Sequence, residues 1–305
     1  MGKRENVSNQ LKADLMLLVV VLAWGFSFLM IDVAVEVLGP FRLNAYRFLV
    51  AFLVAGAVSF RRLRSVSRAT ARYSLLLGGI LAVMFTSVTY GVKYTTLANS
   101  GFLAGLTVLF VPVLSSLVYR RLPERKMAFV ALLCVVGIAL LTLTDDFAIN
   151  RENLLGDVLC TLCGFLYAVH LLVTERAVAA KNVDAYQLGV LQLGVCGAVC
   201  MLVALSVDTM ALPPTPKIWG AVLFLAVVCT GLAFIVQTVA QKYTSASHVG
   251  VINSLETVFA GIVAYAIGGD VLTVKSGVGA LTIVAALFIM EIDFGKLFPG
   301  RRKHV

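Results

Sequence analysis

Charged residues are scarce in this sequence: they make up only 13% of the chain, whereas 60% of its residues are hydrophobic. A water-soluble protein of 305 residues could not keep so apolar a surface in solution. The composition therefore excludes an ordinary soluble domain and predicts a polytopic membrane protein. The net charge of +9 does not indicate a nucleic-acid partner, because the basic residues are spread over short segments between apolar runs.

Groups that carry covalent or metal chemistry are also few. The chain has only three histidines, and it contains no GxxxxGK[ST] motif that would bind ATP. Its six cysteines all lie within apolar runs, so we expect them to pack against neighbouring helices and to form neither disulfides nor a zinc site. We therefore expect no catalytic residue, no metal site and no cofactor, and a protein that is not an enzyme.

Long apolar runs are what the sequence does contain. A helix needs roughly 20 apolar residues to cross the hydrocarbon core of a bilayer. The run that begins at Ala13 is too long for a signal peptide and has no convincing cleavage site, so we interpret it as the first membrane helix. Ten runs of suitable length are predicted, at residues 13–35, 42–60, 74–92, 97–119, 126–144, 154–176, 184–206, 217–240, 246–267 and 275–293.

The basic residues predict how these helices are oriented. Short cytoplasmic loops hold an excess of Lys and Arg. With the N-terminus inside the cell, about nineteen of these residues fall in cytoplasmic segments and about five in the opposite ones. We therefore expect a multi-pass protein of the cell (inner) membrane with both termini in the cytoplasm.

A degraded internal repeat links the two halves of the chain. The segment that begins at Lys93, KYTTLANSGFLAGLTVLF, returns at Lys242 as KYTSASHVGVINSLETVF. Five helices that start inside finish outside, so the second five would run in the opposite orientation. The expected fold is an all-α polytopic membrane protein with ten transmembrane helices in two inverted five-helix repeats.

The repeat also sets the expected domain boundaries. None of the connecting segments is long enough to fold alone. We divide the chain into a cytoplasmic N-terminus, a first repeat, an external linker, a second repeat and a basic cytoplasmic tail, at residues 1–12, 13–144, 145–153, 154–293 and 294–305.

Several short motifs occur in an order that resembles a known family. They are Ala23-Trp24-Gly25 with Ser27 in the first helix, Arg47-Phe48-Leu49 in the second, Tyr94-Thr95 before the fourth and Leu255-Glu256 in the ninth. Together with the ten-helix pattern they resemble the EamA-type branch of the drug/metabolite transporter superfamily. The resemblance covers nearly the whole chain. It implies a carrier of small metabolites, frequently an exporter of amino acids or drug-like compounds, with a cavity formed by helices of both repeats.

The chain departs from the family pattern in two places. The fourth and ninth helices of members often end in a Gly-Glu-Arg-like element, where this chain has Tyr119-Arg120-Arg121-Leu122 and Gly269-Asp270-Val271-Leu272. A proline commonly follows the glutamate of the ninth helix, and here that position is Thr257. These differences bear on the sub-branch and therefore on the substrate.

Polar groups within the bilayer are the candidate site residues, because they are costly there unless they face water or a partner. Asp157, Cys160, Cys163, Tyr167, His170 and Thr174 follow steps of three and four, which places them on one helical face. That face either lines a cavity or forms a tight helix–helix seam. The candidates for substrate binding are Trp24, Ser27, Asn99, Thr107, Tyr167, His170, Asn253 and Glu256.

Two of these candidates, Glu256 and His170, could couple transport to protons. Glu256 falls near the middle of its helix, where it could exchange a proton, bind a substrate ammonium or cap a kinked helix. Trp24 and Tyr167 occupy equivalent places in the two repeats and could form opposite cavity walls or simply pack. Arg47 is the basic residue that lies well inside a run, and we expect its side chain to extend to the membrane interface; the alternatives are an anion site and an ion pair between helices.

The sequence therefore predicts a secondary transporter that moves amino-acid-like, zwitterionic or cationic metabolites across the plasma membrane by alternating access, with export as the expected direction. Its expected partners are a small-molecule substrate, the lipid bilayer and, if transport is coupled, protons. One alternative is a nucleotide-sugar or organophosphate carrier, which should show several basic residues in its cavity. Another is a membrane-embedded lipid-modifying enzyme, which should show converging acids or a nucleophile with its base.

Overall fold

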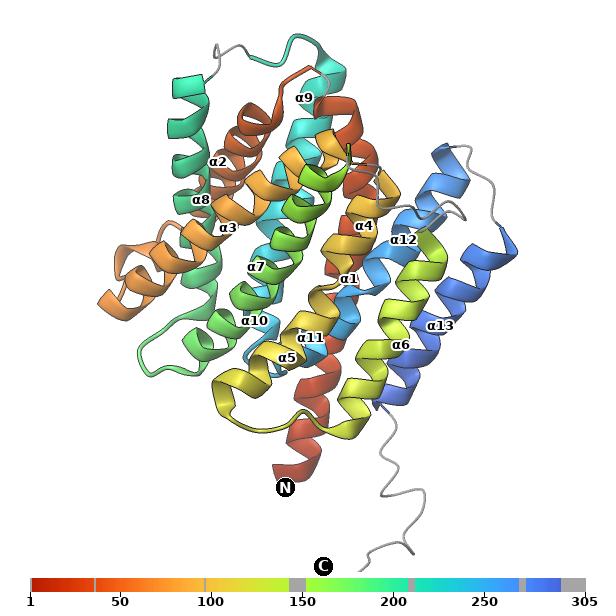
Figure 1. Cartoon of the computed structure of the whole chain (residues 1–305). Helices are drawn as coiled ribbons and strands as arrows, with labels where there is room; N and C mark the ends of the chain where they lie inside the picture. The colour runs from red at the N-terminus through yellow and green to blue at the C-terminus, as the bar shows by residue number, and fades with distance from the viewer. Residues whose placement is uncertain are drawn as a thin grey trace, which may run out of the picture.

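The computed structural model describes residues 2–35, 37–95, 97–142, 152–207, 212–268 and 273–291, and within this part the chain is a bundle of helices without strands (Figure 1). The predicted tail 294–305 and most of the predicted linker 145–153 lie outside the described residues. The first half of the chain forms α1 (Gly2–Val35), α2 (Pro40–Val58), the short helix η1 (Arg62–Arg64), α3 (Arg68–Tyr94), α4 (Leu97–Gly105), α5 (Thr107–Tyr119) and α6 (Arg125–Thr142).

The second half of the chain is also helical throughout its described part. It contains two stretches of π-helix, η2 and η3, within otherwise α-helical segments. Its elements are α7 (Leu154–Ala179), α8 (Ala185–Val207), α9 (Pro216–Phe224), η2 (Leu225–Leu232), α10 (Ala233–Ala240), α11 (Ala246–Asn253), α12 (Leu255–Val263), η3 (Ala264–Gly268) and α13 (Val274–Glu291).

Eight helical segments of the described part are long and apolar enough to cross a membrane, by length and composition. A ninth apolar helix, Val274–Met290, is shorter. The prediction of a polytopic all-α membrane protein is confirmed to this extent, while the count of ten spans and the inverted repeats stay predictions. The beginning of α1 and the end of α13 lie at the same end of the bundle (Figure 1).

Several helices extend beyond the apolar runs from which they were predicted. Hydropathy marks the part of a helix that is predicted to lie in lipid, whereas backbone hydrogen bonding continues into polar sequence. The third apolar run was expected to begin at residue 74, but α3 begins at Arg68 because Ser67 caps it. The Ser67 hydroxyl accepts a hydrogen bond from the backbone N–H of Thr70 at 3.0 Å.

The packing of the bundle joins the two halves of the chain. α2 packs along α8, α3 packs along α7 and α8, α1 packs along α12, and α6 packs along α13. Small residues permit close approach, as at Gly25 of α1, where an added Cβ would lie 2.5 Å from the Cβ of Phe259 in α12. Each half of the chain thus buries its apolar side chains largely against the other half.

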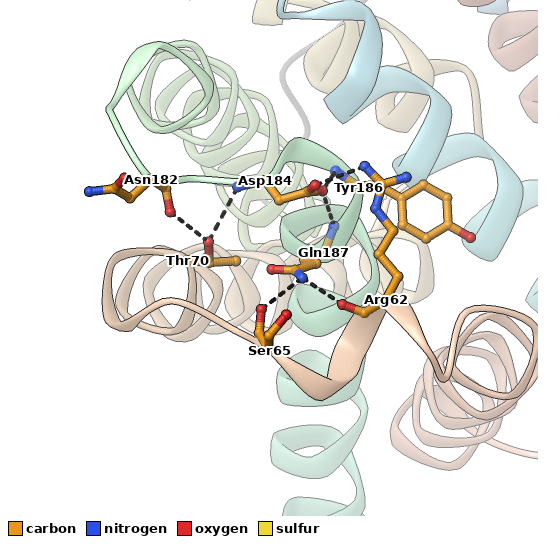
Figure 2. A network of polar contacts seen from close by, with 7 residues as sticks. All are labelled: Arg62, Ser65, Thr70, Asn182, Asp184, Tyr186 and Gln187. Atoms are coloured by element: carbon orange, nitrogen blue, oxygen red, sulfur yellow. Dashed lines mark hydrogen bonds and ion pairs between the residues drawn. The ribbon is translucent and has the colours of Figure 1, made fainter.

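A polar network joins the halves at the end of the bundle where α2 ends and α8 begins (Figure 2). Arg62 donates a hydrogen bond to Asp184 at 2.8 Å and lies with its guanidinium carbon 4.7 Å from the ring centroid of Tyr186. Asp184 also caps α8 by accepting hydrogen bonds from the backbone N–H groups of Tyr186 and Gln187. Burial raises the pKa of Asp184, but the hydrogen bonds from Arg62, Gln187 and Tyr186 outweigh it and leave this pKa below its ordinary value.

Candidate functional site

A cavity of about 170 Å³ lies among the helices of both halves of the chain. Its walls come from α1, α2, α3, α4 and α5 of the first half and from α7, α10, α11 and α12 of the second. Most of its lining is apolar, with a few polar groups, which is typical of a small-molecule site. The volume is below the range of roughly 300–1,000 Å³ usual for drug-sized ligands, so the cavity suits a small solute.

Two interrupted helices pass through the cavity wall. α4 stops at Gly105 and α5 begins at Thr107, while α11 stops at Asn253 and α12 begins at Leu255. The two interruptions, at residues 106 and 254, come within one residue of equivalent places in the internal repeat. The two interrupted helices run in opposite directions through the bundle (Figure 1).

Side-chain hydroxyl groups accompany both interruptions. The Thr107 hydroxyl shares its one proton between two carbonyl oxygens, that of Ala104 at 2.8 Å and that of Gly164 in α7 at 3.0 Å. The Ser254 hydroxyl donates to the carbonyl oxygen of Val251 at 2.6 Å. Such bonds satisfy backbone groups inside an apolar bundle where a regular helix is broken.

The π-helical segment η2 accepts hydrogen bonds from two cavity residues, Trp24 and Arg47. Its Cys229 carbonyl oxygen accepts a hydrogen bond from the indole Nε1 of Trp24 at 2.7 Å. The next residue, Thr230, accepts a hydrogen bond on its hydroxyl oxygen from Nε of Arg47 at 2.9 Å. A π-helical turn changes the direction of backbone and side-chain groups relative to an α-helix, and here it ties α1 and α2 to the same segment.

Arg47 faces the cavity and does not extend to the membrane interface. Its side chain is buried, with 3% of the residue exposed, and its guanidinium carbon lies 4.8 Å from the ring centroid of Phe85 and 5.5 Å from that of Phe48. The sequence-based interpretation of Arg47 as an interfacial residue is wrong. Stacking on two aromatic rings together with the bond to Thr230 keeps the guanidinium among the helices.

Glu256 lines the same cavity. It interacts electrostatically with Arg47, yet the two groups do not form an ion pair. Among the described lining residues, Glu256 is the one carboxylate and Arg47 the one guanidinium. The cavity thus carries one carboxyl group and one guanidinium that form no ion pair with each other.

A hydrogen-bonded layer lies beside these charges. The Tyr167 hydroxyl donates to Oε1 of Gln237 at 2.7 Å and accepts a hydrogen bond from Nδ2 of Asn253 at 2.8 Å. The Tyr167 ring also meets Trp24 edge to face, with 6.1 Å between the ring centroids. The layer joins α7, α10 and α11, and its members Tyr167 and Asn253 line the cavity.

Comparison with known proteins identifies the family. A model described as the EamA-like transporter family matches the chain twice, over residues 11–143 and 154–292. The chain belongs to the EamA-like transporter family. An uncharacterized transporter of Archaeoglobus fulgidus is 27% identical over 95% of this chain and 89% of its own length. A biotin transporter of Salmonella typhimurium is 22% identical over 79% of this chain and 80% of its own length.

A solved structure has the same fold. A crystal structure with 19% sequence identity superposes with a TM-score of 0.79 and covers 93% of this chain and 98% of its own chain. At that identity the likeness concerns the fold alone. The EamA-like protein is therefore a multi-pass membrane protein of a transporter family, and its relatives named above are transporters.

The structure gathers most of the sequence-derived candidates of this EamA-like transporter around one cavity. Cys163, from the predicted stripe, lies there too. The side chain of Asn99 lies outside the described residues. The candidates that line the cavity are Trp24, Ser27, Thr107, Tyr167, Asn253 and Glu256.

His170 is placed elsewhere, in the interface between α7, α8 and α10. It is fully buried, and its Nε2 lies 2.9 Å from Oε1 of Gln192. Gln192 in turn donates from Nε2 to the hydroxyl of Thr238 at 3.0 Å. The stripe on α7 thus divides: Cys163 and Tyr167 face the cavity, whereas His170 lies against the neighbouring helices and Asp157 accepts a hydrogen bond from Thr95.

The cavity also contains residues that the sequence did not single out. Met84, Phe85 and Phe234 supply much of its apolar surface. Nothing in a run of apolar letters marks which members face a cavity and which face lipid. For metals, no group of three or more His, Cys, Asp or Glu side chains within the described ranges could hold an ion.

Proposed function

We propose that this EamA-like protein is a secondary transporter that moves small zwitterionic or cationic organic metabolites across the cell membrane by alternating access, with export as the net direction. The observation that carries the proposal is the cavity, because it is shared by the two halves of the chain and holds the one carboxylate of the described lining at a helix interruption. Such interrupted helices form the central sites of many secondary transporters.

The proposed architecture is ten spanning helices in two inverted repeats, with residues 13–144 and 154–293 as the units and both termini in the cytoplasm. On the two interrupted helices, four pairs of residues at the constant repeat offset line the cavity together. These pairs are Gly101 with Gly250, Ala104 with Asn253, Gly105 with Ser254, and Thr107 with Glu256. A duplicated unit that places its interrupted helix at the centre accounts for all four.

The helix contacts support the same architecture. Exchange of the two repeats turns α2 into α8 and α6 into α13, and each of these pairs is in contact. The exchange also turns the contact of α3 with α7 into a contact of α10 with α1, and the contact of α5 with α7 into one of α12 with α1, and both are present. Rocking of one unit against the other would then open the cavity to either side.

Glu256 is the first candidate for coupling transport to protons. A carboxylate removed from water favours its protonated form unless a cation or hydrogen-bond donors hold it charged. The titratable or charged groups that share its cavity are Arg47 of α2 and Cys163 and Tyr167 of α7. No hydrogen bond to Glu256 is formed within the part of the chain that the structure describes, so its proton could exchange through the cavity. His170 is the second candidate, and its buried place away from the cavity lining makes it the weaker one.

The alternatives of the sequence analysis have less support. An organophosphate carrier should bring several basic side chains together, whereas the described cavity lining has Arg47 alone. An enzyme that modifies lipids would need converging acids or an activated nucleophile. The described lining has one carboxylate and no histidine.

The test is counterflow into proteoliposomes with a panel of amino acids, polyamines, nucleosides and quaternary amines, with and without an imposed pH gradient. Saturable uptake of a zwitterion or cation is expected, with a response to the gradient that Glu256→Gln abolishes. Glu124→Gln is the matched control, because Glu124 is exposed at the start of α6, outside the cavity. If no member of the panel is carried, the transport proposal fails, and if Glu256→Gln keeps the full response to the gradient, its coupling role fails.

A further inference from the structure

The cavity of this protein holds a carboxyl group and a guanidinium that form no ion pair with each other. Arg47 and Glu256 both line it and feel each other's field, but no ion pair joins them. Unpaired charges within an apolar membrane bundle are costly. A partner that fills the space between the two groups would stabilise both.

Arg47 is held as a fixed cation. Thr230 accepts a hydrogen bond from its Nε, and the rings of Phe85 and Phe48 lie beside its guanidinium carbon at 4.8 Å and 5.5 Å. The terminal amino groups make no hydrogen bond to a described residue, so they remain available to the cavity. A planar guanidinium presents a fork of donors that matches a carboxylate, which a flexible ammonium group does not.

Glu256 is the opposite pole. It belongs to the first turn of α12, directly after the helix interruption, and no described donor satisfies its carboxylate. An ammonium group supplies three donors and a positive charge, which is what this carboxylate lacks. A purely cationic ligand would meet the field of Arg47, and a purely anionic ligand would meet the field of Glu256.

The remaining cavity surface indicates what lies beside the charges. Trp24, Met84, Phe85 and Phe234 provide apolar side chains, and the whole cavity measures about 170 Å³. This space suits a compact molecule with a small apolar group. A long polar or multiply charged side group would find no partner among these four side chains.

We propose that Arg47 binds the carboxylate and Glu256 the ammonium group of a zwitterionic α-amino acid with an apolar side chain, and that the two residues together exclude ligands lacking either charge. This inference rests on the proposed function and deepens it, because it names the substrate class of the same cavity. It does not depend on proton coupling.

Binding to the purified protein tests the inference apart from transport. The chain has two tryptophans, and Trp24 lies in the cavity, so a Trp219→Phe background leaves Trp24 as the reporter of occupancy. The probes are alanine, leucine, methionine and phenylalanine, together with leucine methyl ester, N-acetylleucine and 3-methylbutylamine. We expect at least one of the four amino acids to quench or shift the fluorescence of Trp24, and leucine, if bound, to bind at least about tenfold tighter than its three analogues, since a hydrogen-bonded charge is worth about that factor or more.

The variants assign the two poles. Arg47→Gln should bind the amino acid and its methyl ester equally, and Glu256→Gln should bind the amino acid and its N-acetyl derivative equally. Arg47→Lys keeps the charge without the fork, so it should weaken binding while retaining the preference for the free carboxylate. Arg42→Gln, on the same helix but outside the cavity lining, and the exposed Glu124→Gln should behave like the parent.

Three results would overturn the inference. The first is that none of the four amino acids binds; the second is that the amine or the ester binds the parent protein as tightly as the amino acid. The third is that a folded Arg47→Gln or Glu256→Gln variant keeps the parent's discrimination. Amino-acid binding with both preferences but without counterflow would instead refute the transport proposal and leave the inference intact.

Discussion

The contact between α3 and α8 depends on one of two adjacent glycines, and this makes a direct test of the packing. A Cβ added at Gly78 would lie 2.5 Å from the Cβ of Val195 and 2.7 Å from the carbonyl oxygen of Gln192, both in α8. A Cβ added at the next residue, Gly79, would have nothing within 4 Å. The substitutions Gly78→Ala and Gly79→Ala therefore each add one methyl group, the first at a crowded position and the second at an open one.

The expected magnitudes follow from these distances. Nonbonded carbon atoms rest about 3.5–4.0 Å apart, so Gly78→Ala should force α3 and α8 apart by about 1 Å. Overpacking of this kind costs about 1–3 kcal/mol. Gly79→Ala gains helix propensity, worth up to about 1 kcal/mol, without a clash. Gly78→Ala should therefore be less stable than the parent protein, whereas Gly79→Ala should be as stable or more stable.

Thermal unfolding in detergent with a thiol-reactive dye measures the difference. All six cysteines are buried, so the dye reports their exposure as the bundle opens. Unfolding of such proteins is often irreversible, and the comparison therefore uses the apparent midpoint at one heating rate. We expect a midpoint several degrees lower for Gly78→Ala and an unchanged or higher one for Gly79→Ala. Equal midpoints, or a more stable Gly78→Ala, would refute the close contact of α3 with α8.

Three further predictions concern other sites. Asp184→Ala should lower the free energy of unfolding by about 1 kcal/mol, and by more than Asp184→Asn, because only alanine loses the α8 cap. The pKa of Asp184 is lowered in the fold, so the stability that its ionised form contributes is present above pH about 4 and is lost as the pH falls through the folded value. Unfolding of the parent and both variants between pH 3 and 7 measures this. His170→Ala should lower the unfolding midpoint by breaking the bond to Gln192 while leaving the pH dependence of transport unchanged, and a changed pH dependence at unchanged stability would instead favour a coupling role. Trp24→Ala should alter the order of substrate preference in counterflow, and identical kinetics across the panel would assign Trp24 to packing alone.

The helices of this fold were largely predictable, because the hydrocarbon core of a membrane selects for long apolar runs. The predicted run 184–206 corresponds to α8 (Ala185–Val207), and the predicted run 275–293 to α13 (Val274–Glu291). The interruptions at residues 106 and 254 fall inside runs that were predicted to be continuous, 97–119 and 246–267. Apolar side chains are compatible with an α-helix on either side of such a break, so hydropathy alone does not show it.

The π-helical segment η2 was not predictable either. Its sequence, LAVVCTGL, is compatible with a regular membrane helix. The extra residue in its turn is stabilised by contacts with distant parts of the chain, in particular the bonds from Trp24 and Arg47. A local sequence pattern carries no information about partners some 180 to 200 residues away.

Arg47 and His170 show why polar residues within a membrane helix are easier to find than to place. Both stand out among apolar neighbours, and each was assigned a role from its depth in a run. The helical stripe of α7 contains Tyr167 and His170 three residues apart, but a helix in a bundle has several neighbours. Tyr167 meets Trp24, Gln237 and Asn253 at the cavity, whereas His170 meets Gln192 of α8.

The inward position of Arg47 depends on the same long-range arrangement. An arginine five to eight residues into a membrane helix can reach the interface, and a sequence offers no reason to keep it inside. In the folded protein the inward position is supported by Thr230 of η2 and by Phe85 of α3, which come from both halves of the chain. Glu256, from the second half, lines the same cavity. Neither group forms an ion pair within the described part of the chain, so under the proposed binding mode the ligand would offset the cost of keeping both within the bundle, and that cost would be tied to the selection of the substrate.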